Sequence, residues 1–130
     1  MRSDYKPAGW PAVVPRLVTP DVQGLAAFLR AVFEAEGEAA PGRPAEMRIA
    51  DAIVMVSDGG GLREQTSAFL YVYVPEVDAA YSRAMTAGAR EIEPPTDTPY
   101  GDRRATVRDA WGNTWQIATR RQLNKPGEGA

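Results

Sequence analysis

The side chains able to do chemistry in this chain of 130 residues are its tyrosines, arginines, acids and amides, because the sequence contains no histidine and no cysteine. Imidazole and thiolate are the ligands that zinc, copper, nickel and non-haem iron favour, so we expect no site for these metals. Carboxylate, carbonyl and water ligands suit magnesium, calcium or manganese. Catalysis by a histidine base or by a cysteine nucleophile is excluded by composition.

Aromatic side chains recur at every second position of the strand-like run 69–74. Phe69, Tyr71 and Tyr73 alternate there with aliphatic residues and should share one face of a strand. Such a face can stack on a planar ligand and form hydrogen bonds with it. Aromatic residues are also common in any strand, so an ordinary strand is the alternative.

The loop 100–104 ends in two adjacent arginines and leads into another strand-like run. By alternation, one of Arg103 and Arg104 should face the cleft and give a bidentate donor for a carboxylate or a phosphate-like group. Which of the two does so stays open, and Arg103 is placed among the candidate ligand-binding residues. The alternative is a surface salt bridge to Asp102 or Asp109. We find no convincing pair of catalytic carboxylates.

The elements that would position these residues form a repeat. Two segments, VVPRLVTPDVQGLAAFLRAVF and SAFLYVYVPEVDAAYSRAMTAG, each carry an apolar run, a Pro-acid-Val step and a helical pattern, 55 residues apart (for example, 77 − 22 = 55). The apolar positions i, i+3, i+4 and i+7 predict one buried face on each helix. Thr19 is the expected N-cap of the first helix, and Gly37 and Gly88 are the expected helix stops.

Each half is predicted to be a βαβββ module. Strands are expected at residues 38–40 (weak), 46–50 and 52–57 in the first half, and at 90–93, 104–108 and 114–119 in the second. The fold class is therefore α+β, with two tandem modules, 13–58 and 67–119, forming a curved mixed sheet around a cleft. Together they make a single domain, 13–119, with flexible tails at 1–12 and 120–130 and a mobile Gly-rich loop at 58–66.

The stretch YGDRRATVRDAWGNTWQIAT, residues 100–119, is similar to the closing signature of the vicinal-oxygen-chelate superfamily. This superfamily includes glyoxalase I, bleomycin-resistance proteins and extradiol dioxygenases. Its signature is a strand ending in Asp-Pro-x-Gly-Asn, and here Ala110 replaces the proline. The resemblance covers residues 13–119 and implies paired βαβββ modules that commonly assemble as dimers. Trp115 alternates with Gln116 and should lie on the helix side, in the core.

The resemblance also implies where a metal would be held: one ligand comes from the first strand and one from the last strand of each module. Those positions are occupied by Val14, Met55, Phe69 and Gln116. Valine, phenylalanine and methionine do not bind hard or borderline cations, and a lone amide is a weak ligand. We therefore expect no metal and no other cofactor, and neither glyoxalase I nor dioxygenase activity. These four residues either line an apolar pocket with one orienting amide or fill a closed core.

The favoured function is binding of an apolar or aromatic small molecule in a metal-free cleft, as in bleomycin-resistance proteins, with antibiotic or metabolite sequestration as its purpose. The predicted ligand-binding residues are Val14, Met55, Ser57, Phe69, Tyr71, Tyr73, Arg103 and Gln116. An alternative is a lyase or isomerase without a tightly bound transition metal, using a tyrosine, an arginine or Asp102 for proton transfer. A third is a degenerate module kept for protein contacts.

The expected assembly is a homodimer, an expectation that rests on the resemblance. The formal net charge of −2 gives no reason to expect a nucleic acid or an anionic membrane as partner. No apolar run approaches the roughly 20 residues that span a bilayer. The polar start of the chain lacks the apolar core of a signal peptide, so a cytoplasmic location is expected.

Overall fold

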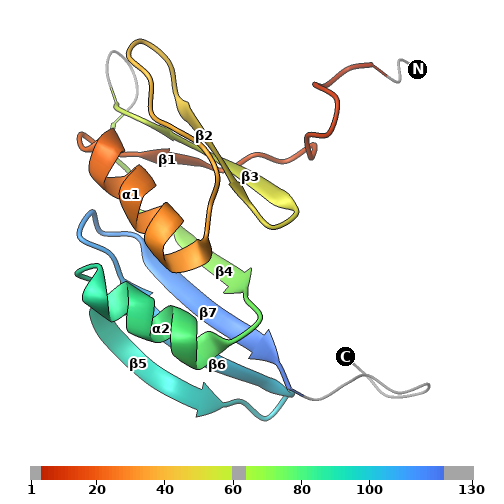
Figure 1. Ribbon diagram of the computed structural model, residues 1–130, viewed down its shortest axis with the longest axis vertical. Helices are drawn as coiled ribbons and strands as arrows, with labels where there is room; N and C mark the ends of the chain where they lie inside the picture. The colour runs from red at the N-terminus through yellow and green to blue at the C-terminus, as the bar shows by residue number, and fades with distance from the viewer. Residues whose placement is uncertain (1–3, 60–63, 122–130) are drawn as a thin grey trace. The chain divides into compact units, whose positions relative to one another are not determined.

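The computed structural model describes residues 4–59 and 64–121, which contain two helices and two sheets (Figure 1). This confirms the α+β prediction. The chain divides into two compact units, Met1–Thr66 and Ser67–Ala130. The predicted flexible tails and mobile loop fall partly on residues 1–3, 60–63 and 122–130, which lie outside the described residues. In the described ranges no helix is long and apolar enough to cross a membrane.

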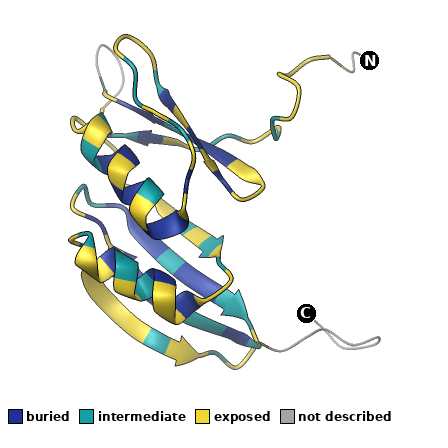
Figure 2. Cartoon of the chain, viewed as in Figure 1, coloured by how far each residue is buried: buried dark blue, intermediate teal, exposed yellow. Residues whose placement is uncertain are grey.

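The first unit is a three-stranded sheet with one helix. Its elements are β1 (Arg16–Val18), α1 (Val22–Phe33), β2 (Ala45–Ile49) and β3 (Ala52–Ser57). The strand order is β1-β3-β2, with β1 parallel and β2 antiparallel to β3. The predicted apolar face of α1 is buried, since Leu25, Ala26 and Leu29 have no exposed surface (Figure 2).

The ends of α1 differ from the prediction. Asp21, not Thr19, is the N-cap: its side chain accepts a hydrogen bond from the backbone N–H of Gly24, while the Thr19 hydroxyl accepts one from Asp21. The helix stops at Glu34 in a left-handed conformation (φ 56°), before Gly37 is reached. Asp caps well because its carboxylate satisfies a first-turn donor that lacks a helical partner.

The weak strand expected at 38–40 is absent, and this prediction was wrong. The segment makes isolated bridges instead, from Glu36 to Arg48 and from Ala40 to Arg43. Pro41 follows directly, and a proline has no N–H with which to continue a ladder.

The second unit contains the complete predicted βαβββ module. Its elements are β4 (Phe69–Tyr73), α2 (Val77–Thr86), β5 (Arg90–Asp97), β6 (Asp102–Arg108) and β7 (Thr114–Arg120). The strand order is β4-β7-β6-β5, with β4 parallel to β7 and the other neighbours antiparallel. Gly88 follows α2 with φ 98°, as a helix stop should.

Strand β5 is longer than predicted and contains Pro94 and Pro95. It tolerates them because it is an edge strand with register shifts on either side of Glu93. Figure 2 shows β5 largely exposed, whereas β7 in the sheet interior is largely buried.

The turn between β6 and β7 is held by a buried acid. Asp109 Oδ1 accepts hydrogen bonds from the backbone N–H groups of Trp111 and Asn113, both at 2.9 Å. Asp109 Oδ2 accepts from Asn113 Nδ2 at 3.0 Å and from Trp115 Nε1 at 2.8 Å. The Asn113 side chain in turn accepts from the backbone N–H of Ala68, just before β4. Trp115 is fully buried, which confirms its predicted place in the core. The segment that carries the family resemblance therefore has a structural role here.

Candidate functional site

The register of the second sheet places aromatic and polar side chains on one face. Tyr71 is paired with Gln116, and Tyr73 with Ala118, which is paired in turn with Arg104. Helix α2 packs against β5, β6 and β7 and buries their other face with Val77, Ala80 and Ala84 (Figure 1). We call the side away from α2 the aromatic face; it comprises Phe69, Tyr71, Tyr73, Asp102, Arg104, Thr106, Gln116 and Arg120.

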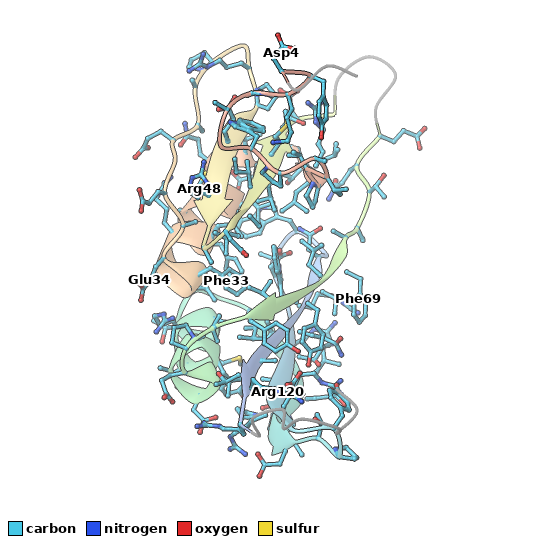
Figure 3. All side chains as sticks on the ribbon, turned by 90° about the vertical axis from the view of Figure 1, so that its right-hand side faces the viewer. Asp4, Phe33, Glu34, Arg48, Phe69 and Arg120 are labelled. Carbon is cyan, nitrogen blue, oxygen red and sulfur yellow. The ribbon has the colours of Figure 1, made fainter. Side chains whose placement is uncertain are left out.

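The rings on this face are open to solvent. Phe69 is 67% exposed, Tyr73 56% and Tyr71 37%. The two tyrosine rings lie 5.3 Å apart between centroids, with 57° between their planes. Figure 3 shows Phe69 projecting at the start of β4 and Arg120 near the end of β7. Exposed aromatic side chains clustered in this way are typical of surfaces that contact a ligand or a partner.

Asp102 is the polar centre of the aromatic face and is only 1% exposed. Its Oδ2 accepts a hydrogen bond from the Tyr71 hydroxyl at 2.6 Å and from the Tyr73 hydroxyl at 2.8 Å. Its Oδ1 accepts from Arg120 Nη1 at 3.3 Å. A buried carboxylate is stable only when paired and hydrogen-bonded, and both conditions are met.

The protonation states follow from these contacts. Burial, and then the hydrogen bond to Asp102, raise the pKa of Tyr71 far above its usual value. The same carboxylate, with a smaller contribution from burial, raises the pKa of Tyr73. Burial alone would raise the pKa of Asp102, but the donors Tyr71, Tyr73 and Arg120 together lower it below its usual range. At neutral pH the acid is therefore charged and both phenols are protonated.

Tyr100 and Arg104 extend the network along the face. Arg104 Nη1 donates to the Tyr100 hydroxyl at 2.7 Å, and that hydroxyl lies 3.5 Å from the Tyr71 hydroxyl. Arg104 Nη2 lies 3.6 Å from Glu93 Oε1. Arg120 Nη1 also donates to the backbone carbonyl of Tyr100, at 2.8 Å, which ties the loop before β6 to β7.

The assignment of Arg103 to the site is corrected by its contacts. Its Nε donates to Asp78 Oδ1 of α2 at 3.0 Å, and its Nη1 to Asp97 Oδ1 of β5 at 3.3 Å. It therefore lies on the helix side, and Arg104 is the arginine on the aromatic face. The cause is strand alternation: residues 102, 104 and 106 share a face, so residue 103 cannot join it.

Four of the predicted ligand-binding residues come together in the second unit: Phe69, Tyr71, Tyr73 and Gln116. The predicted ligand-binding set lacks Tyr100, Arg104 and Arg120, although alternation alone leaves Arg104 open as the alternative to Arg103. From the sequence, Asp102 is expected only as a salt-bridge partner of an arginine or as a proton carrier for the alternative enzyme. The signal that could have found them is the β6–β7 hairpin. Counting outward from its turn pairs Asp102 with Arg120, an opposite-charge pair across the strands.

The other three predicted residues lie in the first unit. Val14 is half-buried and precedes β1, while Met55 and Ser57 alternate along β3. Ser57 lines a pocket of about 490 Å³ together with Arg16. Its hydroxyl oxygen is buried and has no hydrogen-bond partner among the residues that the structure describes. That these residues and the aromatic face share one cleft stays a prediction.

The residues at the family's metal-ligand positions do not fit a divalent cation. Phe69 and Val14 offer no donor atom, and the Met55 sulfur lies 3.9 Å from Arg16 Nη2, a positive group that opposes a second cation. Within residues 4–59 and 64–121, no three acidic side chains gather into a group that could hold a metal ion.

Comparison with known proteins gives one family. A family model described as the Glyoxalase/Bleomycin resistance protein/Dioxygenase superfamily matches residues 13–117. The uncharacterized protein Mb0911c of Mycobacterium bovis is 32% identical over 124 residues, which cover 82% of this chain and 82% of that protein. Rv0887c of Mycobacterium tuberculosis is also 32% identical over 124 residues, covering 82% of this chain and 73% of that protein.

Solved structures share the fold. TioX from Micromonospora sp. ML1 superimposes with a TM-score of 0.73 at 26% identity, over 85% of this chain and 98% of TioX. A glyoxalase/bleomycin resistance protein/dioxygenase family enzyme from Burkholderia phytofirmans PsJN has a TM-score of 0.71 at 20% identity, over 82% of this chain and 96% of that one. At that identity the second likeness supports the fold alone.

Proposed function

Because this chain belongs to the Glyoxalase/Bleomycin resistance protein/Dioxygenase superfamily, we propose that it binds an apolar or aromatic small molecule without a metal, on the aromatic face. The observation that carries the proposal is the arrangement of exposed rings around a buried, fully hydrogen-bonded acid, Asp102. Small-molecule sites combine a mostly apolar lining with a few fixed polar groups, and this face has both.

Binding is favoured over catalysis by the protonation of the same residues. A lyase or isomerase step that moves protons at neutral pH needs a group whose pKa lies near 7. The pKa of Tyr71 is shifted upward and that of Asp102 downward, so each moves away from neutrality. The hydrogen bonds that Tyr71 and Tyr73 donate to the buried Asp102 are suited to holding the two tyrosine rings in place.

The finer parts of the proposal rest on the family. We propose that the ligand is an antibiotic or another metabolite that the protein sequesters, that two copies assemble as a homodimer, and that the protein acts in the cytoplasm. Val14, Met55 and Ser57 of the first unit are proposed to contribute to the same site. Light scattering tests the assembly: a stable monomer at micromolar concentration would contradict the dimer.

The binding proposal is tested by thermal stabilisation with a panel of aromatic natural products. A ligand at 100 times its dissociation constant stabilises the native state by about 2.7 kcal/mol, which is a readily measured rise in Tm. Phe69→Ser should abolish the rise, whereas Tyr5→Ser, at a tyrosine that is 62% exposed but outside the face, should not. If no compound raises the Tm, or if Phe69→Ser leaves the rise intact, the proposal fails. Stoichiometric transition metal in the native protein would refute the metal-free reading.

A further inference from the structure

We propose that the aromatic face selects planar aromatic molecules that carry a hydrogen-bond donor, held through the phenol oxygen of Tyr73. The inference rests on the proposed function and adds the polarity of the ligand. The polarity of the ligand follows from which group donates and which accepts in each hydrogen bond around Asp102. The contacts and the chemistry of the groups determine these directions.

The protons of the two phenols both point at Asp102. An ionised carboxylate only accepts hydrogen bonds, and a phenol has a single O–H to donate. Tyr71 and Tyr73 both contact Asp102 Oδ2, at 2.6 Å and 2.8 Å, so each donates its proton to the acid. Each phenol oxygen is then left with lone pairs and can only accept.

The hydroxyl of Tyr71 also contacts the hydroxyl of Tyr100. Because the Tyr71 proton is engaged by Asp102, the 3.5 Å contact between the two hydroxyls has Tyr100 as its donor. The Tyr100 oxygen accepts from the guanidinium of Arg104 at 2.7 Å. The hydrogen bonds therefore run in one direction, from Arg104 through Tyr100 and Tyr71 to Asp102.

The phenol oxygen of Tyr73 is the acceptor of this network that remains available on the aromatic face. The Tyr71 oxygen already receives the Tyr100 proton, whereas among the described residues none donates to the Tyr73 oxygen. Tyr73 is 56% exposed, so its side chain can be reached from solvent. A ligand stacked beside Tyr73 or Phe69 would satisfy this oxygen with an N–H or O–H group.

The arginine charge that acts on Tyr73, that of Arg120, already faces the buried acid Asp102. Asp102 and Glu93 are each paired with an arginine, Arg120 and Arg104 respectively. A ligand carboxylate at Tyr73 would set lone pairs against lone pairs beside a buried negative charge. Arg108, outside the aromatic face as defined, lies at the far end of β6 and donates to Thr114.

The experiment compares three naphthalenes with the same ring: 2-naphthol, which donates; 2-methoxynaphthalene, which only accepts; and 2-naphthoate, which is an anion. We expect 2-naphthol to bind roughly tenfold more tightly than 2-methoxynaphthalene in an NMR or calorimetric titration, since a net hydrogen bond is worth about that factor. Tyr73→Phe should reduce this preference to about one, whereas Tyr5→Phe should retain it.

A second variant tests the direction of the network. In Asp102→Asn the amide NH₂ can donate to the two phenols, which frees their protons to point outward, so the preference should shift toward 2-methoxynaphthalene. Circular dichroism and a cooperative melting transition verify that this variant folds. Equal binding of all three probes, tightest binding of 2-naphthoate, a preference that survives Tyr73→Phe, or no naphthalene binding at all would overturn the inference. Natural-product binding that depends on Phe69 would still stand in each case and would keep the proposed function.

Discussion

Replacing Asp109 by alanine should destabilise the protein more than any surface acid does. The substitution removes the acceptor of four hydrogen bonds: two backbone N–H groups, the Asn113 amide and the Trp115 indole N–H. Trp115 is fully buried and Asn113 is 3% exposed, so their donors cannot turn to water. Trp111 is only half-buried, so its N–H is not counted among the buried donors.

The expected loss follows from the three donors that stay buried. A buried donor left without a partner costs about 1–3 kcal/mol. Taking about 1–1.7 kcal/mol for each of the three donors, the lower part of that range, gives a loss of about 3–5 kcal/mol. A small domain has about 5–15 kcal/mol in total, so the variant should be marginal. With a urea m-value of about 2 kcal/mol per molar, the middle of the usual range, the midpoint should fall by about 1.5–2.5 M.

The assay is urea denaturation followed by circular dichroism, with two comparison variants. Asp109→Asn keeps one acceptor oxygen and should lose an intermediate amount. Asp51→Ala removes an exposed acid from the β2–β3 turn and should change the free energy of unfolding by less than about 0.5 kcal/mol. A loss in Asp109→Ala below about 1 kcal/mol, or equal to that in Asp51→Ala, would refute the structural role of the turn.

Three further predictions concern pH and packing. The pKa of Asp102 in the folded protein is lowered. Its contribution to stability is therefore present above the ordinary pKa near 4 and is lost as pH falls through the folded pKa. Asp102→Asn should flatten the acid side of the curve of stability against pH, measured by urea denaturation. The pKa of Tyr71 is raised, so its contribution is lost only as pH rises through the folded pKa; in a 295 nm titration Tyr71→Phe should remove a tyrosine that ionises well above 10. Gly37→Ala should lower the free energy of unfolding by at least about 2 kcal/mol in urea denaturation, because at φ +145° its Cβ would collide with the Glu46 carbonyl oxygen. Gly42→Ala, at φ +79° with open space around its Cβ, should show only the backbone strain.

Periodic patterns predicted most of the fold. The i, i+3, i+4, i+7 apolar spacing located both helices and their buried faces, because a helix repeats its facing direction every 3.6 residues. The strand expected at 38–40 does not form. Pro41 follows this segment and has no N–H to continue backbone pairing, and strand propensity takes no account of that pairing. The helix cap went to Asp21 instead of Thr19 because that choice depends on where the first helical turn begins.

The candidate site was predictable in its rings and in Gln116, but not in its charged groups. Alternation along β4 is a local property, so it placed Phe69, Tyr71 and Tyr73 on one face. The choice between Arg103 and Arg104 depends on which side of the sheet α2 covers, and only the packing shows that Arg103 pairs with Asp78.

The sequence by itself determined the chemistry that this protein lacks, the repeat, and which side chains share a strand face, because composition and short-range periodicity need no tertiary contacts. Only the tertiary structure decided that Asp102 is buried and receives the protons of Tyr71 and Tyr73, residues 31 and 29 positions away. That juxtaposition arises because β7 pairs with β4 on one side and with β6 on the other, and such long-range pairing carries no local signature in the chain.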